Sequence, residues 1–243
     1  MVRWVRDATG RFPQRPHYEP AELDGACEEI VRSFLKSQYG AVRYPIETDD
    51  LTVLIEGEAE ELDLYADLSR EGQDVQGETQ FFARGRPRVR IARELTNQVN
   101  RENRLRTTLT HELGHVKFHS FLWGMGQVSM SGKALREASP RCYRESILHA
   151  SRSDWMEWQA GYASGAFLMP VSAVKELVMG ARGRASDLAP IFSSSPAGEE
   201  LVEAVKEKFM VSSDAALVRL IKLRYLIEGE QVPSLFDARH SRT

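Results

Sequence analysis

The feature that most constrains this chain is the stretch Thr-His-Glu-Leu-Gly-His, which contains His111, Glu112 and His115. In an α-helix, residues four positions apart lie on one face, one turn apart. The two histidines can therefore reach a single Zn²⁺ ion, and the glutamate can act as a general base on a water molecule. A helix is expected over 103–119, and the small Gly114 lets a second element approach it closely. The alternative is a solvated helix face with two incidental histidines.

A second helix is expected over 154–169, with Asp154 as its N-cap and Pro170 after its end. One side of this helix is made of small residues, so it can lie tight against the first. Glu157 stands near its start and supplies a third ligand. Two imidazoles and one carboxylate leave an open position, which is typical of catalytic zinc. His119, one turn beyond the motif, is expected beside the ligands or on the surface and not as a ligand.

Composition excludes several classes of protein. The chain has 243 residues, a net charge of -3 and two cysteines. Two cysteines are too few for a disulfide framework and fit a reducing compartment, and Cys27 falls in a helical pattern that predicts a buried thiol. No apolar run is long enough to span a membrane, and the N-terminus lacks a signal-peptide core. We therefore expect a cytoplasmic protein with no membrane partner, in which any nucleic-acid binding comes from a local patch.

The remaining pattern predicts an α+β fold that is mainly helical, with a small β-sheet and a helical C-terminal extension. Alternating apolar residues over 62–68 predict a strand, and 80–83 with 89–92 suggest a hairpin. Long irregular segments such as 121–153 are usually lids or binding loops, or are disordered. The expected organisation is an N-terminal arm at 1–20, most simply an unstructured tail, a metal-binding domain at 21–181, a linker at 182–198, a helical pair at 199–228 and a tail at 229–243.

The helical pair has two interpretations. Two helices joined by a tight turn resemble a helix-turn-helix unit that reads DNA. A plain helical pair that covers the core explains the same pattern, and we favour it.

A run of arginines precedes the metal-binding helix. Arg84, Arg86, Arg88 and Arg90 alternate, so they could share one strand face and meet phosphates of a nucleic acid. A solvated face that balances the acidic run at 56–63 is the alternative, and it is the stronger of the two.

Cys142 lies between the second histidine and Glu157. Its neighbours Arg141 and Arg144 favour the thiolate, the form that binds metal. One hypothesis is that this thiolate occupies the open zinc position and restrains the site until the loop moves. An ordinary loop cysteine is an equal alternative.

Two stretches together resemble the ImmA/IrrE family of bacterial metallopeptidases. They are Arg-Leu-Arg-Thr-Thr-Leu-Thr-His-Glu-Leu-Gly-His at 104–115 and Asp-Trp-Met-Glu-Trp-Gln-Ala-Gly-Tyr-Ala-Ser-Gly-Ala-Phe-Leu-Met-Pro at 154–170. In the family, the motif His-Glu-Leu-Gly-His is followed by an acidic residue and then by a helix of small residues that ends in Leu-Met-Pro. The resemblance covers about residues 20 to 180 and implies a zincin-like fold.

By this resemblance, His111, His115 and Glu157 match the zinc ligands and Glu112 the catalytic glutamate. The family usually has Asn or Asp where this chain has Gly161, so a partner that steers a histidine is missing or supplied elsewhere. Family members cleave a transcriptional repressor, often after DNA damage. The chain also resembles the CapP peptidases of anti-phage systems, which respond to single-stranded DNA. As in those peptidases, we expect no long C-terminal sensor domain, since sixteen residues (228–243) follow Ile227.

The sequence therefore predicts a zinc-dependent endopeptidase. Its expected substrate is a helix-turn-helix repressor encoded nearby, and single-stranded DNA is a candidate activator. The competing class is a non-catalytic regulator that uses the same zinc fold to bind DNA or a repressor. Glu112 favours catalysis, because binding needs no general base. A nuclease or another metallohydrolase would usually have more carboxylates near the metal.

Overall fold

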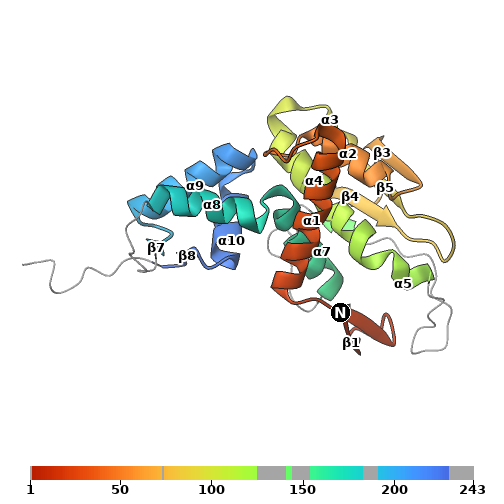
Figure 1. Cartoon of the computed structure of the whole chain (residues 1–243). Coiled ribbons are helices and arrows are strands. Elements are labelled where there is room, and N and C mark those ends of the chain that lie inside the picture. The colour runs from red at the N-terminus through yellow and green to blue at the C-terminus, as the bar shows by residue number, and fades with distance from the viewer. Residues whose placement is uncertain (1, 73, 125–140, 144–153, 183–190, 230–243) are drawn as a thin grey trace, which may run out of the picture.

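Helix α7 (Trp155–Leu168) lies at the centre of the fold and contacts both α1 (Pro20–Tyr39) and α4 (Glu102–His119) (Figure 1). The computed structural model describes residues 2–72, 74–124, 141–143, 154–182 and 191–229. In Figure 1 the small sheet lies on one side of the central helices and the C-terminal helices lie on the other. The predicted α+β class is confirmed, with helices as the main component.

Local sequence sets the ends of the central helices. Glu19 and Glu22 form a capping box at the start of α1, and Gly40 ends this helix with a φ of 71°. Such a left-handed conformation favours glycine. The Asp154 side chain accepts hydrogen bonds from the backbone amides of Met156 and Glu157 and so caps α7, as predicted. The short helix α2 (Thr48–Glu56) packs against α4.

A four-stranded sheet covers α4, in the order β3-β5-β4-β6. Strand β3 runs parallel to β5, whereas β4 is antiparallel to both β5 and β6. The predicted hairpin is present, but its first strand ends at Gln80 instead of beginning there. The sequence did not predict a strand at 75–80 because most of its residues are polar, although five of the six are buried. The strands are β3 (Glu61–Ala66), β4 (Val75–Gln80), β5 (Arg88–Ala92) and β6 (Arg141–Tyr143). The short helices α3 (Arg93–Thr96) and η1 (Val99–Arg101) lie between β5 and α4, and α5 (Phe121–Gly124) follows α4.

The expectation of an unstructured tail at 1–20 is wrong. β1 (Arg3–Arg6) and β2 (Gln14–His17) form an antiparallel hairpin. Phe12, in the loop between them, is buried in a second apolar cluster against the rings of Trp123 and Trp155. Burial of these large aromatic side chains stabilises the ordered segment.

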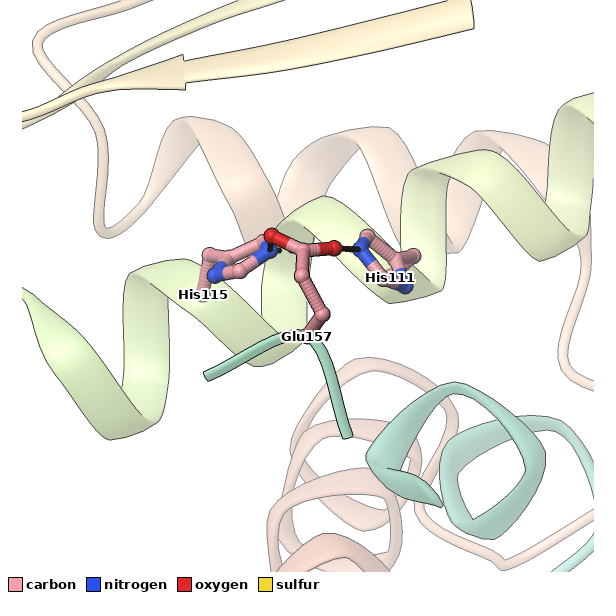
Figure 2. A group of neighbouring side chains, drawn as sticks. All are labelled: His111, His115 and Glu157. Atoms are coloured by element: carbon pink, nitrogen blue, oxygen red, sulfur yellow. Dashed lines mark hydrogen bonds and ion pairs between the residues drawn. The ribbon is translucent and has the colours of Figure 1, made fainter. Parts of the chain in front are cut away.

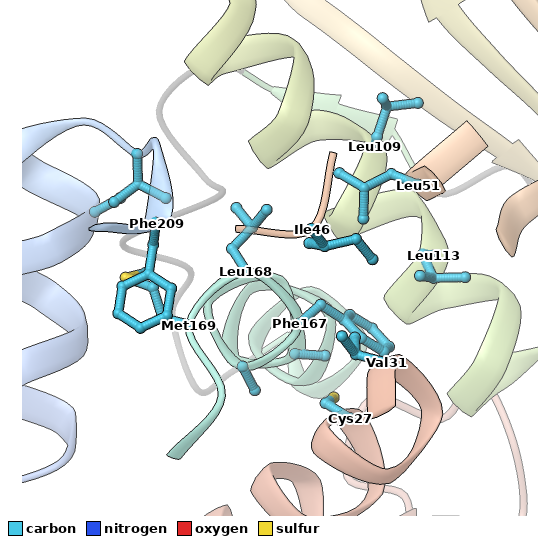
Figure 3. Packing of buried hydrophobic residues seen from close by; sticks show 14 of the residues in the cluster. Cys27, Val31, Ile46, Leu51, Leu109, Leu113, Phe167, Leu168, Met169 and Phe209 are labelled. Carbon is cyan, nitrogen blue, oxygen red and sulfur yellow. The ribbon is translucent and has the colours of Figure 1, made fainter. Parts of the chain in front are cut away.

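The C-terminal helices join the main hydrophobic core. Figure 3 shows Phe209, from the end of α9, beside Met169 and near Leu168 at the end of α7. The predicted linker at 182–198 is corrected in part: 191–192 forms a strand, α9 begins at Pro196, and 183–190 lies outside the described residues. The tail from 230 also lies outside them. The elements are α8 (Val171–Arg182), β7 (Ile191–Phe192), α9 (Pro196–Phe209), α10 (Ser213–Lys222) and β8 (Leu226–Ile227).

Candidate metal centre

Close packing between α4 and α7 brings the three predicted ligands together. A Cβ atom added to Gly114 on α4 would lie 3.1 Å from the Cα atom of Ala160 on α7. The two helices can therefore approach closely at this point only because residue 114 has no side chain. The contact aligns the first turn of α7, which carries Glu157, with the histidine face of α4.

The Glu157 carboxylate lies between the two imidazoles (Figure 2). Oε2 is 3.1 Å from Nε2 of His111, Oε1 is 3.3 Å from Nε2 of His115, and the two Nε2 atoms are 3.2 Å apart. A metal with three ligands at about 2.0–2.1 Å in tetrahedral geometry holds them roughly 3.3 Å apart. One ligand atom from each residue lies within 4.8 Å of the other two, which is close enough for the group to hold a metal ion.

Electrostatics keep the Glu157 carboxylate ionised. Burial raises the pKa of this group, but the neighbouring imidazoles, chiefly that of His115, outweigh it and hold the pKa well below the usual value. An anionic oxygen is the form that binds a cation, so the third ligand is in its binding state.

Glu112 is fully buried beside the ligands. Thr79 on β4 donates a hydrogen bond of 2.5 Å to its Oε2, whereas Oε1 has no hydrogen-bond partner among the described residues. Burial raises the pKa of Glu112 to about 7, against the lowering effects of His115 and the Thr79 hydroxyl. A carboxyl group with a pKa near neutrality can both take up and release a proton at physiological pH.

Sequence reasoning missed the role of β4. A Cβ atom on Gly77 would lie 2.4 Å from Oε1 of Glu112 and 2.9 Å from Cγ2 of Thr108. The absence of a side chain at residue 77 therefore lets the sheet lie against the glutamate. A glycine and a threonine two positions apart in a short polar segment were the available signal, but it carries no helix or metal pattern.

His119 lies beside the ligands, and not on the surface. It is fully buried, and its Nδ1 is 3.0 Å from Nδ1 of His115. Burial lowers the pKa of His119 well below its usual value, so the ring is neutral. The partner of His115 is thus supplied by the next turn of α4.

The other histidine has no comparable partner. Nδ1 of His111 makes no hydrogen bond to any described residue. Gly161, at the position where the resemblance implies Asn or Asp, lines a small cavity between α7 and α10 together with Arg219. Among the described residues, His111 is thus left without a group that steers its ring from Nδ1.

The prediction that four arginines share a strand face is wrong. Only Arg88 and Arg90 lie on β5, because Gly85 (φ 96°) and Pro87 form the turn before it. Arg88 lies 3.6 Å from a Glu61 carboxylate oxygen and Arg90 lies 2.9 Å from one of Glu78. Arg84 and Arg86 are exposed in the turn, and Arg86 donates to the Gly57 carbonyl. The strand arginines thus balance local acids, and DNA contact by any of the four stays a prediction.

The two cysteines have different surroundings. Cys27 is buried in the main core, as predicted. Cys142 lies on β6, where its backbone pairs with Gly77 of β4, next to Glu112. The side chain of residue 142 lies outside the described part of the structure, so its role as a fourth ligand stays a prediction.

Comparison with known proteins adds no relative. No model of a known protein family matches the chain, and no curated protein is similar to it. Within the described residues, no helix combines the length and the apolar character needed to cross a bilayer. The functional argument therefore rests on the residues of the site itself.

Proposed function

We propose that this protein is a zinc-dependent endopeptidase. The observation that carries the proposal is the pairing of two groups. Three ligand atoms within 4.8 Å of one another lie on α4 and α7, and a buried carboxyl group with a pKa of about 7 lies beside them. A purely structural metal site would usually close the fourth position with a further ligand and would need no titratable acid next to it.

The donor set favours zinc over other common metals. Calcium and magnesium prefer all-oxygen sites, whereas two imidazole nitrogens and one carboxylate are typical of Zn²⁺. When bound here, zinc would supply Lewis acidity toward a carbonyl oxygen and toward a water molecule. His111, His115 and Glu157 would hold it.

Glu112 would carry the proton in peptide hydrolysis. Its free Oε1 can accept a proton from the attacking water as the new C–O bond forms, and Thr79 holds the other oxygen in place. The same carboxyl group would then deliver that proton to the leaving amine as the C–N bond breaks. No proton is gained or lost by the protein over the cycle.

The biological setting follows from the resemblance noted in the sequence. The substrate would be a helix-turn-helix repressor encoded nearby, and cleavage in the cytoplasm would release defence or stress genes after DNA damage or phage infection. Single-stranded DNA would be the activator, with the exposed Arg84 and Arg86 as the sites to examine first. Cys142 would restrain the enzyme before activation.

The test compares Glu112→Gln and Glu157→Ala with the wild type. Repressors encoded beside the gene are incubated with each protein, with and without single-stranded DNA, and bound zinc is measured by elemental analysis. We expect about one zinc per chain in wild type and Glu112→Gln, and none in Glu157→Ala. Cleavage should fall at least about 10²-fold in Glu112→Gln, the lower range for loss of a general base.

Two results would contradict the proposal. If Glu112→Gln cleaves at the wild-type rate, Glu112 is not the base. If the wild type binds zinc and a repressor but never cleaves it, the non-catalytic regulator is the better description.

A further inference from the structure

A line of hydrogen bonds connects the N-terminal hairpin to the metal ligands. Nε2 of Gln159 on α7 donates to the carbonyl of Pro16 on β2 at 3.1 Å, and Oε1 of Gln159 lies 3.0 Å from Nε2 of His119. Nδ1 of His119 then lies 3.0 Å from Nδ1 of His115. The three side chains are buried, with exposed fractions of 0–1%. Water therefore does not substitute for any of these partners.

The donors and acceptors in this line have one consistent direction. A backbone carbonyl can only accept, so Pro16 fixes which end of the Gln159 amide faces it and turns the amide oxygen toward His119. That oxygen can only accept, so His119 carries its proton on Nε2. A neutral imidazole has one N–H, so Nδ1 of His119 accepts from the Nδ1–H of His115. The remaining nitrogen of His115, Nε2, is then a lone pair that faces His111 and Glu157.

The neutrality that this direction requires follows from the surroundings of His119. Its ring is fully buried, and its two nitrogens face the Gln159 amide and the His115 imidazole, neither of which can carry a negative charge to compensate one on the ring. A charge on the ring would not be compensated there. The Trp155 indole also packs against the ring, nearly perpendicular to it and at 5.5 Å between centroids, and excludes solvent from that side.

We propose that Gln159 and His119 are positioning residues that hold His115 in the tautomer that binds metal, with the N-terminal hairpin as the anchor. This inference rests on the proposed zinc site. Without this chain of hydrogen bonds, the Nε2–H tautomer of His115 would be populated, and its Nε2 could not bind an ion. A hydrogen bond from the other ring nitrogen also raises the basicity of a ligating histidine. His111, whose Nδ1 has no described partner, lacks this support.

Two substitutions of His119 separate this role from packing. The Oδ1 atom of asparagine can occupy the place of Nδ1 and accept from His115, whereas leucine has a similar shape but no acceptor. We expect His119→Leu to weaken zinc binding by about 10–100-fold, the usual cost of losing such a partner, and His119→Asn to restore most of it. A packing role predicts the opposite order, because a buried site tolerates leucine better than an amide.

The measurement is zinc affinity by competition with a chromophoric chelator, with folding checked by circular dichroism. Gln159→Met, which removes the acceptor for His119, should also weaken zinc binding. His17→Leu, a histidine on the same hairpin but outside the line, should leave affinity unchanged. Equal zinc affinity in His119→Leu and the wild type would overturn the proposal.

A second readout does not depend on the metal. The ¹⁵N chemical shifts of His115 in the zinc-free protein should show the Nδ1–H tautomer, and in Gln159→Met a mixture. If the zinc-free wild type shows Nε2–H on His115, the positioning role is wrong. If instead the tautomer is as expected but the wild type binds no zinc, the proposed function fails and the hydrogen-bond direction stands.

Discussion

At the scale of single residues, the position of Glu112 depends on a glycine in the sheet. We expect Gly77→Ala to displace Glu112, since the new Cβ atom would lie 2.4 Å from its Oε1. A misplacement of about 1 Å in a reacting group can cost about 10²-fold in rate, so cleavage should fall by at least that factor. Zinc content should stay at the wild-type level, because the atoms nearest to the new Cβ belong to Glu112 and Thr108 and not to a candidate ligand.

Gly25→Ala is the matched control for this prediction. Gly25 is exposed within α1, and a Cβ atom there would meet nothing within 4 Å. This variant should keep full activity and gain about 0.5–1 kcal/mol of stability, because alanine is the better helix former. Normal cleavage by Gly77→Ala would show that Glu112 can move without loss.

Lys222 should make the stability of the protein depend on pH. Burial and the charge of Arg219 lower the pKa of Lys222 to about 8, from its usual value of 10.5. Between these values the unfolded chain holds a proton that the folded protein has lost, so the free energy of unfolding rises with pH. This rise in the free energy of unfolding is complete above about pH 10.5 and is lost as the pH falls toward 8.

Urea denaturation between pH 7.5 and 10.5 would measure this dependence, as a difference from Lys222→Met. We expect the stability of the wild type to rise relative to the variant across that window. Lys206→Met, at a lysine paired with Glu203 on the surface, serves as the control and should follow the wild type. Parallel curves for wild type and Lys222→Met would mean that Lys222 titrates normally.

At the scale of secondary-structure elements, the metal centre depends on how closely α4 and α7 approach. We expect Gly114→Ala to push the helices apart, because its Cβ atom would lie 3.1 Å from the Ala160 Cα atom and 3.2 Å from its carbonyl oxygen. Neither backbone atom can rotate away. Overpacking typically costs about 1–3 kcal/mol, against a gain of about 1 kcal/mol from helix propensity.

The diagnostic result is a weaker affinity for zinc, since Glu157 moves with α7 while both histidines stay on α4. Gly165→Ala on α7 provides the comparison, because its Cβ atom would meet Arg219 at 3.7 Å, an ordinary contact. That variant should bind zinc normally. Unchanged zinc affinity in Gly114→Ala would show that the helices need not be so close.

At the scale of the whole molecule, Arg106 on α4 connects the helix that carries both candidate histidine ligands to the C-terminal helices. This side chain is fully buried and donates to the carbonyls of Ile46, Phe209 and Met210. Arg106→Met keeps much of the length of the side chain but leaves these carbonyls without that donor. Each buried carbonyl left unpaired costs about 1–3 kcal/mol, so we expect a loss of at least about 2 kcal/mol. Arg101→Met, at an exposed position, should change stability by no more than about 0.5 kcal/mol.

The shared core also predicts a single unfolding transition for the wild type. The four tryptophans are at positions 4, 123, 155 and 158, so their fluorescence reports on the part of the fold around the metal centre. Far-ultraviolet circular dichroism also reports on α8, α9 and α10. The two signals should give one midpoint in denaturant. Separate midpoints would show that the helical pair is an independent domain, which is what the linker predicted at 182–198 suggested.

Patterns within single helices were readable from the sequence. The spacing of His111 and His115, the cap at Asp154 and the place of Glu157 in the first turn of α7 follow from helix geometry, which depends on neighbours in the chain. For the same reason the segments 103–119 and 154–169 were predicted within a residue or so of α4 and α7. The buried state of Cys27 followed from the same periodicity.

Contacts between distant segments were decided by the tertiary structure alone. Gly77 lies against Glu112, 35 positions along the chain, and Pro16 meets Gln159 across 143 positions. Arg84 and Arg86 lie before β5 and not on it, because Gly85 has a positive φ and the strand begins only at Arg88. The alternation of arginines in the sequence did not reveal this change in backbone conformation. The sequence by itself predicted the candidate metal ligands and the candidate base, since each belongs to a helical pattern, which is local. The groups that steer those residues were decided by packing, since a hydrogen bond or a close approach between remote elements leaves no periodic trace in either one.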